Sequence, residues 1–94
     1  MALLDEASVS ERLGRLPGWQ HADGAIRKSY RFSSFAAAID FVNRVAELAE
    51  ASDHHPDIDI RYTDVTLALS THSAGGLTGR DFELAERIEA GERA

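Results

Sequence analysis

Two hydrophobic periods alternate along the chain, and the helical period comes first. Val9, Leu13 and Leu16 recur at positions i, i+4 and i+7, which places them on one face of a helix. This spacing predicts a short helix over about residues 5–15. Pro17-Gly18 ends it, because proline cannot continue the backbone hydrogen-bond ladder.

A first pair of strands follows this helix. Residues 19–22 and 25–32 are predicted to form a hairpin, since Asp23-Gly24 between them is a strong hairpin signal. Lys28 interrupts the apolar face of the second strand. We therefore expect this strand to lie near an edge of the sheet.

The longest helical pattern begins after Ser33 or Ser34, either of which is a natural N-cap, and continues to about Ala51. Its main stripe consists of Phe35, Ala38, Ile39, Val42, Ala46 and Ala49. Phe41, Val45 and Leu48 widen the apolar surface beyond that stripe. We expect this helix to be buried on two sides.

The second hairpin and the last helix complete the pattern. Apolar and polar residues alternate over residues 57–62 and 65–70, with a predicted turn at Thr63-Asp64. After the glycine pair Gly75-Gly76, Thr78 and Asp81 form a capping box, with Asp in place of the usual Glu or Gln. This box predicts the start of the third helix.

The element order is helix, two strands, helix, two strands, helix. It predicts an α+β fold in which helices cover one face of a four-stranded antiparallel sheet. With 94 residues, the chain is expected to form a single domain over residues 1–94 with a small core. A free sheet face or edge would be available to a second copy, so we expect a homo-oligomer.

Composition narrows the functional classes. The sequence has 10 Lys+Arg against 16 Asp+Glu, a formal net charge of −6, so nucleic acid is not an expected partner. The sequence has no cysteine, which excludes disulfides and thiolate metal sites. No apolar run approaches the roughly 20 residues of a membrane span, and no signal peptide is evident. A cytoplasmic protein is expected.

Three of the four histidines lie at the ends of predicted elements. His54 and His55 are adjacent at the exit of the long helix, and His72 ends the fourth strand, whereas His21 is alone in the first strand. Imidazole exchanges protons near neutral pH, so this placement is typical of a proton-transfer site. The alternatives are a polar helix terminus for His54-His55 and a surface position for His72. We interpret His21 as structural or exposed.

A metal centre and a nucleophilic triad are weaker alternatives. Three histidines with Glu50 or Asp53 would supply enough ligands for zinc. However, adjacent histidines project in different directions, and the sequence contains no His-x-x-x-His motif. No cysteine and no serine in a nucleophile-elbow motif is present. We therefore expect no metal.

Two carboxylates flank the histidines. Asp81 has a structural role in the capping box and, beside Arg80, a compatible role at the rim of a pocket. Glu50 lies four residues before His54, so both would occupy one face if the helix continued that far. Glu50 is therefore either half of a solvated pair or an anchor for the N–H donors of a ligand.

The spacing of these residues resembles the signature of the pterin-4a-carbinolamine dehydratases. It reads Glu50, three residues, His54-His55-Pro56, five residues, Tyr62, nine residues, His72, eight residues, Asp81. Flanking blocks that are similar to the family's are Leu16-Pro17-Gly18-Trp19, Ser70-Thr71-His72-Ser73 and Gly75-Gly76-Leu77-Thr78. The resemblance extends over nearly the whole chain.

The resemblance implies dehydration of 4a-hydroxytetrahydropterin to quinonoid dihydropterin, the form recycled after aromatic amino acid hydroxylation, without a metal or organic cofactor. It also implies the family's four-stranded antiparallel sheet with helices on one face, in a dimer or tetramer. The roles that it implies for individual residues are proton transfer by His54 and His72, ligand contact by His55, pterin anchoring by Glu50, and support of the pocket by Asp81 with Arg80.

The sequence departs from the family at two places, and other functions stay open. Ile58 stands where many relatives have an aromatic residue, and Ser73-Ala74 replaces other side chains of the animal relatives. These changes bear on ligand stacking and loop contacts rather than on proton transfer. One alternative is a non-catalytic protein-interaction module on the same fold. Another is a different physiological pterin, for instance one tied to molybdenum cofactor chemistry.

Overall fold

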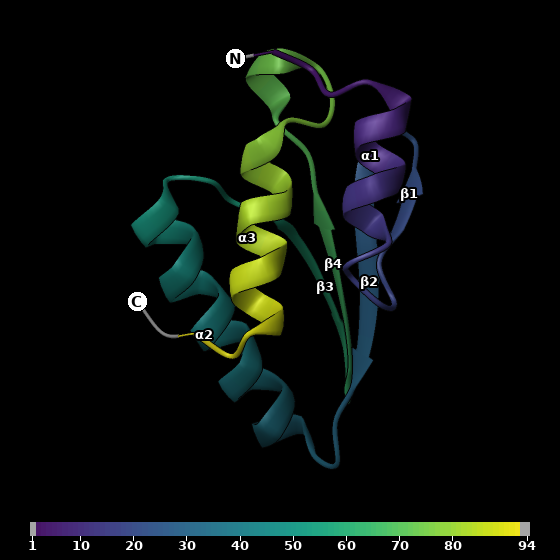
Figure 1. Ribbon diagram of the computed structural model, residues 1–94. Coiled ribbons are helices and arrows are strands. Elements are labelled where there is room, and N and C mark those ends of the chain that lie inside the picture. The colour runs from purple at the N-terminus through teal and green to yellow at the C-terminus, as the bar shows by residue number, and fades with distance from the viewer. Residues whose placement is uncertain (1, 93–94) are drawn as a thin grey trace.

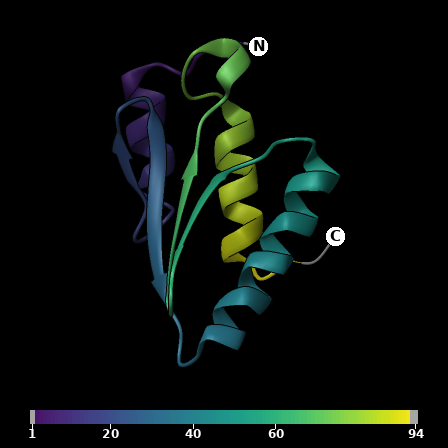
Figure 2. The ribbon, with the colours of Figure 1, turned by 180° about the vertical axis from the view of Figure 1, so that it is seen from behind.

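The computed structural model describes residues 2–92, so residues 1 and 93–94 of the predicted domain lie outside the described part. The elements occur in the predicted order: α1 (Glu6–Leu13), β1 (Gln20–Ala22), β2 (Ala25–Arg31), α2 (Phe35–Ser52), β3 (Asp57–Arg61), β4 (Asp64–Leu69), a 3-10 turn (His72–Ala74) and α3 (Gly79–Glu89). The strands form one antiparallel sheet in the order β1-β2-β4-β3. The α+β fold class is confirmed, with the helices on one face of the sheet (Figures 1 and 2).

Side-chain caps set the starts of the helices. The Asp5 carboxylate accepts a hydrogen bond from the Ser8 amide at 2.8 Å before α1. The Ser34 hydroxyl accepts from the Ala37 amide at 3.1 Å before α2, which makes Ser34 rather than Ser33 the cap. The predicted capping box of α3 is present. These bonds satisfy amide donors that have no partner within the first turn of a helix.

The core lies between the sheet and the helices. Alternate residues of β4 are buried, and Ile26 of β2 extends the same inner face of the sheet. Phe82 of α3 is fully buried. The other main contributors from the helices are Val9, Val45, Leu48, Leu84, Ala85 and Ile88. Alternation with a period of two thus separates a helix-covered sheet face from a solvated one.

The turn of the second hairpin lies one residue earlier than the sequence predicted. Arg61 pairs with Asp64, so Tyr62 and Thr63 form the two-residue loop. This register keeps Ile60 opposite Val65, whereas a slip by one residue would turn every side chain of β3 to the other face. Tyr62 therefore takes a positive φ of 53° outside the strand and is 75% exposed.

The second strand lies near an edge of the sheet, as predicted, but it is not the edge strand itself. β2 lies between β1 and β4. However, β1 spans only three residues and pairs with β2 no further than Arg27. Lys28 breaks the apolar face for another reason, because its ammonium group forms a salt bridge with Glu89 at the end of α3. A partly buried ion pair, rather than an edge position, explains this polar residue.

The prediction that α2 is buried on two sides is wrong for the single chain. The buried residues of α2 are Ala38, Phe41, Val45, Leu48 and Ala49, and they share one face. Phe35 is 51% exposed, and Ala46 is exposed on the side away from the core. No other helix of residues 2–92 covers that outer side (Figures 1 and 2).

No helix of the described residues is long and apolar enough to cross a membrane.

Candidate active site

The end of α2 determines where His54 and His55 lie. Asp53 follows the last helical residue with φ 49° and ψ 45°, a left-handed conformation that ends the helix. The His54 amide then donates to the carbonyl of Ala49 at 3.0 Å, which turns the chain back toward the helix axis. The helix therefore ends before His54, and the two imidazoles leave it on a loop.

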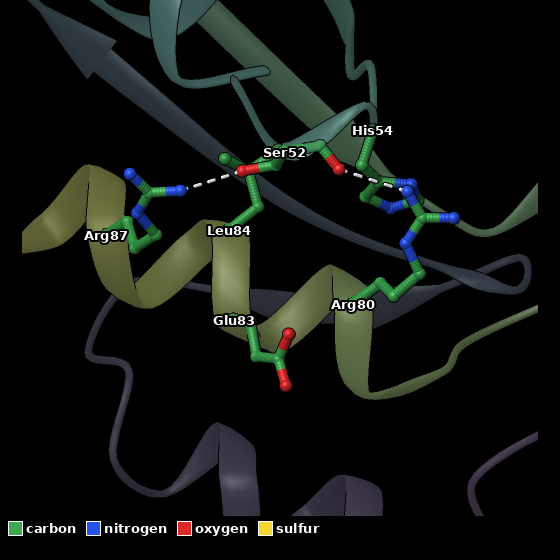
Figure 3. A pocket seen from close by; sticks show the side chains of 6 residues that line it. All are labelled: Ser52, His54, Arg80, Glu83, Leu84 and Arg87. Carbon is green, nitrogen blue, oxygen red and sulfur yellow. Dashed lines mark hydrogen bonds between the residues drawn. The ribbon is translucent and has the colours of Figure 1, made fainter. Parts of the chain in front are cut away.

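Arg80 binds this loop to α3. Its guanidinium donates to the carbonyl oxygen of Ser52 at 3.1 Å and to that of Asp53. Carbonyl oxygens at the C-terminus of a helix have no amide donor within the helix, so the guanidinium supplies one. A cation at a helix C-terminus also interacts favourably with the helix dipole. Arg87 adds a bond of 2.8 Å to the Ser52 hydroxyl (Figure 3). Two arginines of α3 thus hold the segment that leads to His54.

Asp81 is the buried centre of the site. Its side chain has no exposed surface, and its Oδ1 lies 2.5 Å from His54 Nε2. Its Oδ2 accepts from the Thr78 amide at 3.0 Å and from the Thr71 hydroxyl at 2.9 Å. One carboxylate therefore joins the loop after α2, the end of β4 and the start of α3. All three segments carry residues of the sequence signature.

The bond to Asp81 fixes the orientation of the His54 ring. Because Asp81 accepts from two other donors, we infer that its carboxylate is ionised and that His54 Nε2 donates in their bond. In the neutral imidazole, Nδ1 is then the free base. His54 is only 7% exposed, so the bond is shielded from solvent. The arrangement gives His54 a defined orientation and a basic nitrogen.

Glu50 pairs with His55 rather than with His54. Its carboxylate bonds to His55 Nε2, and both side chains are exposed. The i, i+4 relation to His54 does not hold, because α2 ends at Ser52 and the chain reverses there. Glu50 and His55 thus form a solvent-accessible acid–base pair beside the buried one.

His72 opens the 3-10 turn directly after Thr71, and its side chain is exposed. Since Thr71 contacts Asp81 and Asp81 contacts His54, one intervening carboxylate links the segments of the two histidines. His21, by contrast, lies on β1 with its side chain exposed and opposite Ile26. Among residues 2–92, no three His, Asp or Glu side chains are grouped closely enough to hold a metal ion.

A small hollow of about 80 Å³ lies beside His54, between the end of α2 and α3. Figure 3 shows Arg80 and Arg87 reaching across it from α3, while Glu83 points away. Ligand pockets usually exceed about 300 Å³, so this hollow is too small for a bicyclic ring. Neither His55 nor His72 lines it. A planar heterocycle would therefore have to meet the exposed imidazoles from another side.

The sequence interpretation identified Thr78 as the capping partner of Asp81, but it missed Thr71. The available signal was general, because a buried carboxylate needs several donors and hydroxyl side chains at strand and helix ends supply them. The buried carboxylate–imidazole pair and the two exposed imidazoles are groups that can give and take protons near neutral pH, as the side chains of acid–base enzymes do.

Comparison with known families agrees with this class. The sequence pattern of the family described as "Pterin 4 alpha carbinolamine dehydratase" matches residues 2–91. The chain belongs to this family, and it is an enzyme of the hydro-lyase class.

Full-length relatives support the same assignment. A protein of Roseiflexus castenholzii named "Putative pterin-4-alpha-carbinolamine dehydratase" is 59% identical over 88 residues, covering 94% of this chain and 95% of the relative. A protein of the same name in Acidobacterium capsulatum is 57% identical over 90 residues, covering 96% and 98%.

Two solved structures share the fold. A "transcriptional coactivator/pterin dehydratase" of Brucella melitensis has a TM-score of 0.90 and 38% identity, covering 94% of this chain and 96% of that one. A pterin dehydratase-like protein described as a RuBisCO assembly factor in the alpha-carboxysome has a TM-score of 0.63 and 26% identity, covering 77% and 83%.

Proposed function

We propose that the protein dehydrates 4a-hydroxytetrahydropterin to quinonoid dihydropterin by histidine acid–base catalysis, in the recycling of a pterin cofactor. The observation that carries the proposal is the buried bond between Asp81 and His54, adjacent in the fold to the segment of His72. A carboxylate that fixes one imidazole in orientation and tautomer is a common way to prepare a base or an acid.

The reaction needs two proton transfers. The C4a–O bond breaks as the departing hydroxyl takes a proton and leaves as water, and N5 loses its proton as the C4a=N5 double bond forms. Two imidazoles in opposite protonation states can supply and accept these protons near pH 7. We assign this pair to His54 and His72.

The other site residues have proposed roles in binding the ligand and in positioning the catalytic histidines. His55, exposed and paired with Glu50, is placed to contact the ligand, and the Glu50 carboxylate is an acceptor for the N–H edge of a pterin. Asp81 orients His54 from the buried side. Arg80 donates to backbone carbonyls, so its proposed contribution is to hold the loop that carries the two imidazoles. None of these roles requires a metal or an organic cofactor.

The first test is stopped-flow dehydration of freshly generated 4a-hydroxytetrahydropterin with His54→Ala, His72→Ala and the matched control His21→Ala. Loss of a general acid or base lowers turnover by about 10²-fold or more, so both site variants should fall to that extent. His21 is exposed on β1, and its variant should keep wild-type turnover. Unchanged turnover in both site variants would refute the assigned roles.

A protein-interaction module on the same fold is the second candidate, since one structural relative is described as an assembly factor. It predicts a folded protein that gives no acceleration with any pterin, whereas the dehydratase predicts a large, saturable acceleration. A third possibility is the same dehydration with a different physiological pterin. Turnover measured on pterins with two different side chains would test it.

A further inference from the structure

Thr71 lies where the two halves of the site meet. It follows β4, precedes His72, and is 2% exposed. Its hydroxyl oxygen is 2.9 Å from Asp81 Oδ2 and 2.7 Å from Thr78 Oγ1. A hydroxyl with two buried polar partners is fixed in orientation, because each proton and lone pair must find its partner inside the protein.

The protons of this cluster have one consistent order. The Asp81 carboxylate is an acceptor, so Thr71 donates its only hydroxyl proton to Oδ2. Thr78 must then donate to Thr71, and the Thr78 oxygen in turn accepts from the Arg80 amide at 3.3 Å. The result is a directed hydrogen-bond chain from the first turn of α3, through two hydroxyls, to the carboxylate that holds His54.

The chain fixes the orientation of Asp81. Rotation about the terminal torsion of an aspartate is soft, so the carboxylate plane is set by its partners rather than by a rotamer well. The Thr71 hydroxyl and the Thr78 amide both occupy Oδ2, which leaves Oδ1 to His54. Without the hydroxyl, only the Thr78 amide would hold Oδ2.

The backbone of Thr71 builds the turn that carries His72. Its amide donates to the Gly76 carbonyl at 2.9 Å, and its carbonyl accepts from the amides of Ala74 and Gly75, each at 3.0 Å. Gly75 closes the turn with φ 78°, in the left-handed region that favours glycine. The same residue therefore contacts Asp81 through its side chain and positions His72 through its backbone.

We propose that Thr71 is a positioning residue that fixes the positions of His54 and His72 relative to each other. Its hydroxyl orients Asp81, and hence the His54 ring, while its backbone anchors the turn of His72. The proposal rests on the proposed dehydration for one of its two readouts, which is turnover. The other readout, the orientation of the His54 ring, does not depend on the reaction.

The test compares Thr71→Val with Thr71→Ser in the full chain. Valine has nearly the shape of threonine but no hydroxyl, whereas serine keeps the hydroxyl and loses a methyl group. We expect Thr71→Val to lower kcat by about tenfold or more with little change in KM, since misplacing a catalytic group costs rate rather than binding. Thr71→Ser should recover most of this loss.

Ring nitrogen NMR of His54 supplies the second readout. In the wild type, we expect one tautomer with the proton on Nε2. In Thr71→Val, we expect a mixture of tautomers or a broadened ring signal, and in Thr71→Ser the wild-type signal. Thr66→Val is the matched control, because Thr66 lies on β4, the strand that leads to Thr71, and its hydroxyl bonds to Ser29 on the exposed sheet face, at 2.8 Å.

Two results would overturn the proposal. One is Thr71→Val with wild-type kcat and a single His54 tautomer. The other is an equal loss in the valine and serine variants, which would assign the effect to packing. If Thr71→Val does not fold, Thr71→Cys, a weak donor of similar size, takes its place in the same comparison. Absence of turnover in the wild type would refute the dehydration, while the His54 signal would still test Thr71.

Discussion

Asp81 shows how one side chain combines a structural and a functional position. Its carboxylate accepts from the Thr78 amide, which completes the capping box, and from His54 Nε2. A capping carboxylate of a surface helix would be solvated, but this one has no exposed surface. Capping therefore fixes the carboxylate against α3 and leaves its second oxygen for the imidazole.

A second carboxylate, Glu89, plays a structural part at the other end of α3. Its Oε1 accepts from Trp19 Nε1 at 2.8 Å, from the Tyr30 hydroxyl at 3.0 Å and from the Lys28 ammonium. Burial raises the pKa of Glu89, but the hydrogen bonds from Lys28, Trp19 and Tyr30 outweigh it and hold the pKa below its ordinary value. Burial and the Glu89 charge raise the pKa of Tyr30, so its phenol stays a donor.

This bonding predicts a pH-dependent stability. Because the folded-state pKa of Glu89 lies below its ordinary value of 4.5, its contribution is present above about pH 4.5 and is lost as the pH falls through the folded-state pKa. Glu89→Gln should lower the free energy of unfolding by about 1–3 kcal/mol at pH 7. Urea unfolding between pH 3 and pH 7 measures both effects. An equal cost of the substitution at both pH values would contradict the prediction.

At the scale of elements, the termination of α2 is the decisive local feature. Asp53 adopts a left-handed conformation, which is unfavourable for residues with a Cβ atom, and the helix ends at Ser52, two residues after Glu50. The same ending brings His54 under α3 and leaves His55 exposed. Helical periodicity predicted the length of α2 to within one residue, but it could not show how the chain leaves the helix.

Asp53→Gly should therefore stabilise the protein. Glycine adopts the observed φ of 49° without strain, and we expect a gain of about 0.5–1 kcal/mol. For a domain of this size, 1 kcal/mol corresponds to a rise in Tm of about 4–8 °C. Asp53→Val is the contrasting variant and should lower Tm, since a β-branched residue is strained there. Thermal unfolding of the two variants measures this difference, and a lower Tm for the glycine variant would contradict it.

In the molecule as a whole, one face of α2 has no cover among residues 2–92 (Figures 1 and 2). Phe35 is half exposed, and Ile60 on the edge strand β3 is 38% exposed. A small domain with an uncovered apolar stripe and a free sheet edge has surfaces that associate readily. The sequence pattern predicted two buried sides for α2, and the single chain buries one.

We accordingly predict a homo-oligomer. Light scattering coupled to size-exclusion chromatography should give a mass of a dimer or tetramer rather than the 10.3 kDa of one chain. Ala46→Glu places a charge on the exposed side of α2 and should lower that mass if this side is the contact. Glu47→Gln, an exposed and milder change on the same helix, serves as the control. A wild-type mass of 10.3 kDa would refute the prediction.

The amino-acid sequence was enough to predict the element order and the inward-facing residues of the strands, but not which stripe of α2 faces the core. Periods of two and 3.6 residues reflect which side chains can avoid water, and that preference does not depend on details of the tertiary fold. The sequence also placed the imidazoles at element ends, and its spacing indicated the family. These features are local or one-dimensional, which is why a pattern can carry them.

The connections within the site could not be predicted from the sequence, because they depend on contacts between elements that lie far apart in the chain. The partner of Asp81 lies 27 residues away, and the link through Thr71 depends on three segments meeting in one buried place. The pairing of Glu50 with His55, the ion pair of Lys28 and the reversal at Asp53 likewise follow from contacts between elements. Hydrogen bonds are directional and short in range, so their partners are chosen only after packing has brought the elements together.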